Sequence, residues 1–210
     1  MASDGKGWSL IARFSNNDNK NWMRDDGLWW YDQQVAMGTT TNPSINTDMI
    51  SPAFWLFSGR DFKFTRSDDP SHTPLLQTTG NCLAGKTFRS KITSYGIFKY
   101  GKVWASDRCL GSCTVQYGGR FKSTHGFQLA ECSGDLQTAN KIGFWCDWVQ
   151  GDGSVMMIGG GGGKNTCQYS NHGIGITEAN AASFQYSDEH DFGHFSDTSA
   201  RSYSLNLWIR

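Results

Sequence analysis

The chain has 210 residues, enough to bury one sizeable core, and it is expected to form a single domain over residues 1–210. Charged residues make up 18% and the formal net charge is zero, so the chain carries no basic field to hold a phosphate backbone, which argues against nucleic acid as a partner. Aromatic residues reach 14%, with nine Trp and 25 Gly, which indicates a folded, loop-rich chain rather than a disordered one.

The first half of the chain predicts short strands and polar loops. Residues 7–14 alternate in a strand-like pattern, and residues 16–19 supply turn chemistry. The Trp-rich residues 22–31 could form a core cluster or an exposed platform, and a core cluster is the more common use of Trp. A polar loop with a turn at Asn42-Pro43 covers residues 38–52, and the apolar run 53–57 follows it.

The strict alternation of residues 61–66 predicts a half-buried strand. The loop at 68–74 carries two carboxylates that could hold an ion, although a solvated turn is the expected role. Further short strands or irregular extended segments are expected in the middle of the chain, at residues 87–92, 95–104, 120–122 and 126–129.

No window shows sustained helical spacing, and the best helix candidates are short, at residues 46–50 and 177–184. The apolar alternation of residues 203–209 predicts a closing strand. The first six residues lack the apolar stretch of a signal peptide and are expected to be a processed or expression terminus. No apolar run approaches the length needed to insert into a membrane.

The six cysteines lack the Cys-x-x-Cys spacing of zinc or redox motifs. An even number in a Gly- and Trp-rich chain predicts disulfides and an extracellular, secreted protein, while six buried thiols in a cytosolic protein is the less favoured alternative. The pattern does not choose among the pairings, although Cys109 and Cys113 could close a small loop.

Five consecutive glycines at 159–163 are the most unusual feature of the sequence. Such a run cannot be a helix or a stable strand interior, so it predicts a tight loop or a close approach of backbone to another segment or ligand. The run does not end in the Gly-Lys-Ser/Thr of a phosphate loop, and the chain has no Gly-x-Ser-x-Gly and no His-Glu-x-x-His. A hydrolase using the histidines is therefore disfavoured, and the protein is expected not to be an enzyme.

Acidic and aromatic residues flank the glycine run on both sides. Calcium takes six to eight hard oxygen ligands from loops, including backbone carbonyls that a glycine-rich segment supplies freely. The predicted calcium ligands are Asp147, Asp152, Asp188, Glu189 and Asp191. Ordinary turn roles for these residues are the alternative.

Aromatic rings beside hydroxyl-binding groups suit a sugar, which has an apolar C–H face and a polar rim. The predicted ligand-binding residues are His172, His190, His194, Trp148, Tyr186 and Phe195. For each ring, packing beneath its own loop is an equally favoured alternative. The loop 187–195 is expected to decide which ligand binds, and the glycine run to decide whether the site forms.

Three stretches resemble the intelectins (X-type lectins) and other fibrinogen-related domains. Gly-Trp-Ser-Leu-Ile-Ala at 7–12 resembles the opening of these domains. Phe-Trp-Cys at 144–146, followed by Ile-Gly-Gly-Gly-Gly at 158–162 and Cys167, is similar to the intelectin glycine segment. Ile-Thr-Glu at 176–178 and the terminal Leu-Asn-Leu-Trp-Ile-Arg are similar to the way intelectins finish.

The resemblance implies an α+β, disulfide-bonded fold of mostly twisted β-sheet, short helices and long ordered loops. It also implies a long-range bridge between Cys82 and Cys167, structural calcium, and a surface calcium that captures vicinal hydroxyls of glycans. The chain departs from the family before the glycines, where residues 152–157 replace a Glu-His pair and a cysteine.

Two functions follow as expectations. The first is a secreted calcium-dependent lectin. The second, motivated by the missing Glu-His pair, is an adhesion or matrix module that binds a protein and uses calcium only for structure. A homo-oligomer is compatible with both.

Overall fold

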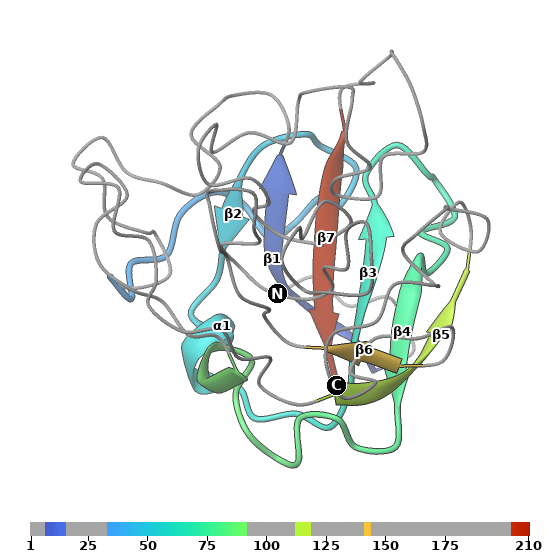
Figure 1. Ribbon diagram of the computed structural model, residues 1–210. Coiled ribbons are helices and arrows are strands. Elements are labelled where there is room, and N and C mark those ends of the chain that lie inside the picture. The colour runs from blue at the N-terminus through green and yellow to red at the C-terminus, as the bar shows by residue number, and fades with distance from the viewer. Residues whose placement is uncertain (1–6, 16–32, 92–111, 119–140, 144–202) are drawn as a thin grey trace, which may run out of the picture.

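A computed structural model describes residues 7–15, 33–91, 112–118, 141–143 and 203–210, and these form one seven-stranded sheet with two short helical turns (Figure 1). The strands are β1 (Ser9–Ser15), β2 (Met49–Ile50), β3 (Phe62–Arg66), β4 (Leu76–Thr79), β5 (Ser112–Tyr117), β6 (Lys141–Gly143) and β7 (Ser204–Ile209). The helical turns are α1 (Ala53–Leu56) and the 3-10 helix η2 (Arg89–Lys91). The sheet-rich part of the expected fold is thus present.

Strand order across the sheet is β2-β1-β7-β3-β4-β5-β6, and every neighbouring pair is antiparallel. The first and last strands of the chain therefore lie side by side, with Leu10 opposite Trp208 and Phe14 opposite Leu205 (Figure 1). The register shifts between Leu10 and Ala12, so Ile11 is the extra residue of a β-bulge. Both terminal strands were predicted from their alternation, and both are confirmed.

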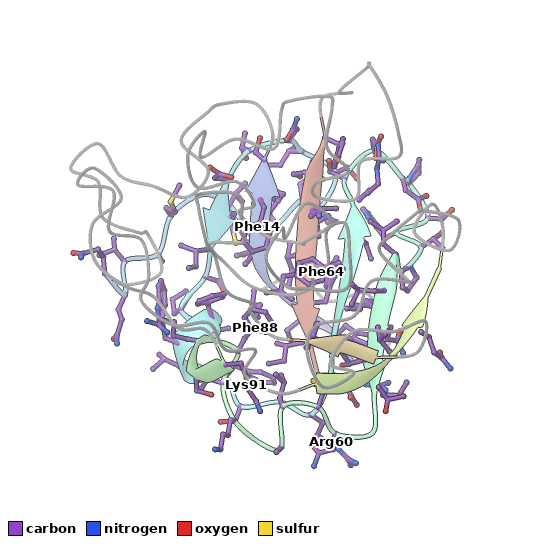
Figure 2. All side chains as sticks on the ribbon, viewed as in Figure 1. Phe14, Arg60, Phe64, Phe88 and Lys91 are labelled. Atoms are coloured by element: carbon purple, nitrogen blue, oxygen red, sulfur yellow. A yellow bond between two sulfur atoms is a disulfide. The ribbon has the colours of Figure 1, made fainter. Side chains whose placement is uncertain are left out.

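One face of the central strands carries the main apolar core. Side chains of a strand alternate between faces, so Phe62 and Phe64 of β3 project to the same side. Their rings lie 6.1 Å apart, and Phe14 of β1 lies at the same distance from Phe64. Phe88, just before η2, packs on Phe62 at 5.4 Å and on Phe54 of α1 at 5.5 Å (Figure 2). Helix α1 and the residue before η2 therefore add rings to this face of the sheet.

The opposite face is also covered, which corrects the expectation for residues 61–66. Lys63 and Thr65 alternate with Phe62 and Phe64 in β3, yet all five residues of the strand are buried. An apolar cluster of Trp8, Leu10, Met49 and Trp208 occupies part of this second face. The strand is therefore buried on both sides. The prediction was wrong because alternation in the sequence shows which side chains are polar, but it does not show whether the rest of the chain covers them.

Two other local predictions are wrong. Residues 46–48 are irregular with a bend at Thr47, and residues 49–50 form the short strand β2 rather than a helix, because Met49 and Ile50 pair with β1. Residues 89–91 form the 3-10 helix η2 rather than an extended segment. The segments 16–31, 95–104, 120–122, 126–129 and 177–184, for which turns, aromatic clusters, strands or a helix were predicted, lie largely or wholly outside the described residues.

Candidate functional site

All eleven predicted site residues, together with the glycine run, lie outside the described residues. The structure nonetheless fixes the two ends of the segment that carries them. The segment follows β6, an edge strand of the sheet, and precedes β7, an interior strand. These two strands are four strand spacings apart in the sheet order, roughly 19 Å. The segment with every predicted calcium ligand therefore connects an edge strand to an interior strand.

Residues 39–48, here called the strap, cover part of the second face of the sheet, where β1 and β7 carry polar side chains. Arg13 of β1 donates its guanidinium hydrogens to the carbonyls of Thr47 at 2.5 Å, Asn42 at 2.9 Å and Thr39 at 3.2 Å. Arg13 is fully buried, and this burial lowers its pKa from 12.5 to about 10, against the opposing attraction of Asp48. Arg13 therefore stays charged at neutral pH and holds the strap through directional hydrogen bonds.

Strand β7 holds the same strap from the other side. The Asn206 amide donates to the Pro43 carbonyl at 2.7 Å, and the Ser204 hydroxyl donates to the Ile45 carbonyl at 3.0 Å. The strap thus turns these backbone carbonyls toward the sheet, while Thr41 and Ser44 are exposed. Gly38 has a φ of +72° at the start of the strap, a conformation that favours glycine. The result is a polar segment held against the C-terminal strand, with Asp48 as its acidic residue.

A stack of cationic and indole groups occupies the same face nearer the chain end. The Lys63 ammonium lies 4.9 Å from the ring centre of Trp8 and 5.5 Å from that of Trp208. The Arg210 guanidinium lies 4.6 Å from the Trp8 ring. The Trp208 indole N–H donates to the Thr65 hydroxyl at 2.9 Å. Because both indoles are almost completely buried, these rings stabilise the fold through cation–π contacts and do not offer a stacking platform to a ligand.

The loop 68–74 has the turn structure that was expected rather than an ion site. Arg66 donates to both carboxylate oxygens of Asp68, at 2.8 and 2.6 Å. The backbone N–H groups of Ser71 and Thr73 donate to the Asp69 carboxylate at 2.9 and 2.8 Å. Desolvation raises the pKa of Asp69, but these hydrogen bonds and the charge of His72 outweigh it, so the pKa lies below its usual value. Both carboxylates are thus engaged within the turn.

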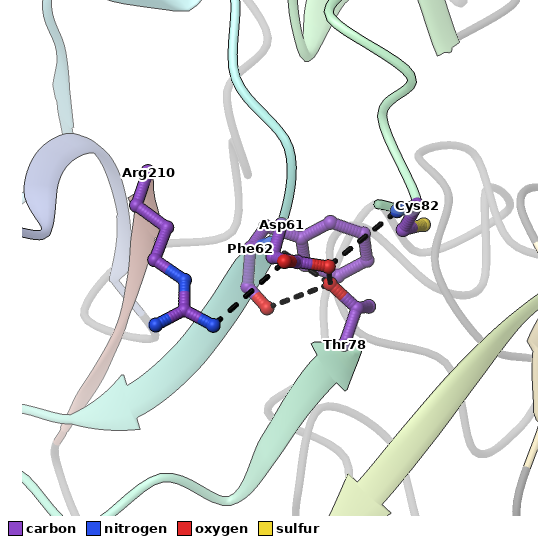
Figure 3. Close-up of polar contacts among 5 residues, drawn as sticks. All are labelled: Asp61, Phe62, Thr78, Cys82 and Arg210. Atoms are coloured by element: carbon purple, nitrogen blue, oxygen red, sulfur yellow. Dashed lines mark hydrogen bonds and ion pairs between the residues drawn. The ribbon is translucent and has the colours of Figure 1, made fainter. Parts of the chain in front are cut away.

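Asp61, at the start of β3, joins four parts of the chain (Figure 3). Its carboxylate accepts hydrogen bonds from the Thr78 hydroxyl at 3.3 Å and the Cys82 backbone N–H at 3.4 Å. The Arg210 guanidinium lies 3.7 Å from the same carboxylate. Asp61 therefore links the C-terminal residue to the loop that follows β4, and its role here is structural.

Cys82 forms a disulfide with Cys113 of β5, with their Cα atoms 5.3 Å apart. The expected bridge between Cys82 and Cys167 is therefore wrong, and so is a small loop closed by Cys109 and Cys113. The bond links the loop after β4 to the neighbouring strand, where chain topology brings the two cysteines together. Spacing in the sequence does not reveal this contact, because it depends on which strands become neighbours.

One apolar hollow lies beside α1, with a volume of about 320 Å³. It is lined by Pro52, Ala53, Leu56 and Phe57, and Leu56 is 75% exposed. These four described lining residues carry no titratable side chain.

Within the part of the chain that the structure describes, no group of three or more His, Cys, Asp or Glu side chains could hold a metal ion. No helix among those residues is long and apolar enough to cross a membrane. Sequence reasoning did not single out Arg13 or Lys63. The sequence feature that could have identified them is a positively charged residue inside an otherwise apolar or aromatic strand. Such a residue is expected to have buried partners.

Comparison of the chain with known protein-family models finds no match, and comparison with curated protein sequences finds none either.

Proposed function

We propose that the protein is an extracellular calcium-dependent lectin with an intelectin-like, fibrinogen-related fold, and that it binds glycans. The observation that carries the proposal is the Ile-Gly-Gly-Gly-Gly segment between Cys146 and Cys167, with acidic and aromatic residues on both sides. Two other stretches of the resemblance, at 7–12 and 205–210, overlap β1 and β7, which are paired neighbours in the sheet. This pairing brings the two terminal stretches that resemble the family next to each other.

Asp147, Asp152, Asp188, Glu189 and Asp191 would hold calcium in this proposal. Every one of these donors is a carboxylate, and hard oxygen ligands in loops are what calcium prefers. Calcium would supply a positive centre with open positions for sugar hydroxyls. His172, His190 and His194 would orient or contact the sugar, while Trp148, Tyr186 and Phe195 would stack on its C–H face.

A disulfide between Cys82 and Cys113 supports secretion, because such bonds form and persist mainly in oxidising compartments. The short helices and the predominance of antiparallel sheet are also compatible with the proposed fold.

Glycan-array binding in calcium and in EDTA tests the proposal directly. We expect glycan binding in calcium that is lost in EDTA. The absence of glycan binding in both buffers would contradict the lectin function. The paired variant Asp188→Asn/Asp191→Asn should lose calcium-dependent binding. Asp68→Asn is the matched control, because Asp68 is paired with Arg66 in a turn and should not affect calcium binding.

Thermal unfolding reports on calcium separately from the sugar. A ligand that binds only the folded state stabilises it by about 2.7 kcal/mol at a hundredfold excess over its dissociation constant. Chelation should therefore lower the melting temperature of the wild type. Equal melting temperatures in calcium and EDTA would mean that the five carboxylates are ordinary turn residues.

The missing Glu-His pair favours a second function, an adhesion or matrix module in which calcium is purely structural. In that case calcium would raise the melting temperature without any glycan binding. A protein ligand recovered by the immobilised domain, and unaffected by competing sugars, would support this function over the lectin.

A further inference from the structure

Two large apolar side chains are exposed to solvent at the end of α1. The helical turn buries Ala53, Phe54 and Trp55. Leu56, by contrast, is 75% exposed, and the next residue, Phe57, is 36% exposed. Both line the apolar hollow of about 320 Å³ beside α1. Single apolar side chains are normal on a protein surface, but adjacent ones beside a hollow indicate a contact surface.

The chain that leaves α1 is fixed in place by backbone contacts. Ser58 and Thr87 form an isolated β-bridge. The Gly59 N–H donates to the Lys86 carbonyl at 3.1 Å, and a side chain at position 59 would collide with the end of β7. The chain that follows α1 therefore lies alongside the chain that precedes η2.

The residues around the exposed apolar side chains carry positive charge. Segments 49–60 and 82–91 together contain four basic residues and no acidic one. Arg60 and Lys86 are exposed, and Arg60 points away from the sheet at the edge of the molecule (Figure 2). The other two basic residues lie on η2 and are half-buried. The carboxylate of Asp61, the next residue after Arg60, is buried and engaged with other groups.

This combination of charge and apolar exposure identifies the kind of partner. A symmetric dimer through this surface would bring the same cations of two copies together, and the like charges would repel. A stable complex with another protein needs a surface of matched shape, about 800 Å² on each side. Fluid lipids need no matched shape, because protruding apolar side chains beside cations are enough to hold a protein at a bilayer with anionic headgroups.

We propose that the surface formed by Leu56, Phe57, Arg60 and Lys86 docks on a bilayer that contains anionic phospholipids. The two apolar side chains enter the boundary between headgroups and acyl chains, and the two cations contact the headgroups. The domain lies on the bilayer by this mode and does not cross it. None of the four side chains belongs to the predicted calcium or sugar site, so the proposal stands apart from the lectin function.

Vesicle flotation in EDTA, without glycan, tests the proposal on the wild-type protein. One set of vesicles is pure phosphatidylcholine, and the other is equal parts of phosphatidylcholine and phosphatidylserine. We expect binding to the mixed vesicles that exceeds binding to phosphatidylcholine and that falls at high salt, because salt screens the headgroup charge. No binding to the mixed vesicles, or equal binding to both sets, would overturn the proposal.

Variants separate the apolar contribution from the charged one. Leu56→Ser should weaken binding to the mixed vesicles by about tenfold. Leu56→Met is the matched control, because it keeps an apolar side chain and should bind like the wild type. Normal binding by a folded Leu56→Ser protein would show that the exposed side chain does not enter the bilayer and would refute the docking mode.

The cations are tested by neutralising both of them. Arg60→Gln/Lys86→Gln should weaken binding by about 25-fold, or roughly fivefold for each charge removed. Arg60→Lys/Lys86→Arg keeps both charges and should bind like the wild type. Both residues are exposed, so the variants should fold, and thermal unfolding checks this. Unchanged binding of the neutral variant would overturn the role given to the cations.

Sedimentation velocity without lipid tests the alternative occupant, a second copy of the chain. We expect Leu56→Ser to leave the oligomeric state of the protein unchanged. A wild-type dimer that dissociates in Leu56→Ser would assign this surface to self-association and overturn the proposal.

Discussion

On strands β1, β3 and β7, one face carries Phe14, Phe64 and Leu207, while the other carries Arg13, Lys63 and Asn206. Both faces are buried, but they are stabilised differently. Ring packing and removal of apolar surface from water stabilise the first face. The second depends on hydrogen bonds from Arg13, Ser204 and Asn206 to backbone carbonyls of the strap.

This difference shows how one strand can serve two kinds of packing. Apolar contacts are not directional, so a side chain of similar volume and polarity can replace Phe64 at moderate cost. A guanidinium that reaches three carbonyls has no such substitute, because the donors must point in fixed directions. The hydrogen bonds on the second face therefore determine the position of the strap.

Truncation on the apolar face is expected to have the largest effect. Phe64→Ala removes a buried ring that contacts Phe14 and Phe62, and should lower the free energy of unfolding by about 3–5 kcal/mol. Phe57→Ala is the matched control, because Phe57 is 36% exposed and should cost much less. Urea unfolding of both variants measures the difference, and equal losses would show that Phe64 does not lie in the main core.

Removal of the guanidinium tests the polar face. Arg13→Met retains much of the side-chain volume but removes the donors to the strap, and should cost roughly 2–3 kcal/mol. Hydrogen exchange should rise within residues 39–48 more than in β3. Arg60→Met serves as the control because Arg60 is exposed at the surface (Figure 2). An Arg13→Met protein with unchanged exchange in the strap would contradict the role given to Arg13.

The smallest effect is expected at the β3–β4 turn and depends on pH. The pKa of Asp69 is lower in the folded state, so its carboxylate contributes stability above the ordinary value of 3.8. That contribution is lost as the pH falls from about 3.8 through the lower folded value. Asp69→Asn removes one of the two acceptor oxygens, so wild type and variant should differ at pH 5 and converge towards pH 2. Urea unfolding across this range measures the gap, and a gap that does not change with pH would contradict the prediction.

Local sequence signals predicted the terminal strands and the turn at 68–74. β1 and β7 were visible because apolar residues alternate there over many positions, and that pattern favours a strand whatever its neighbours. The turn was visible because Asp residues next to Ser and Pro form local hydrogen bonds, as Asp69 does with Ser71 and Thr73. These interactions join residues close in sequence, so no knowledge of the rest of the fold is needed.

The sequence by itself determined that the two ends of the chain and residues 61–66 are strand-like, that the chain can form disulfides, and which acidic and aromatic residues flank the glycine run. Only the tertiary structure decided that β1 pairs with β7, that Lys63 is buried between two indoles, and that Cys82 bonds to Cys113. The physical reason is that each of these contacts joins residues far apart in the chain. Composition and spacing describe local preference, whereas partner choice between distant segments follows from how the whole sheet buries its two faces.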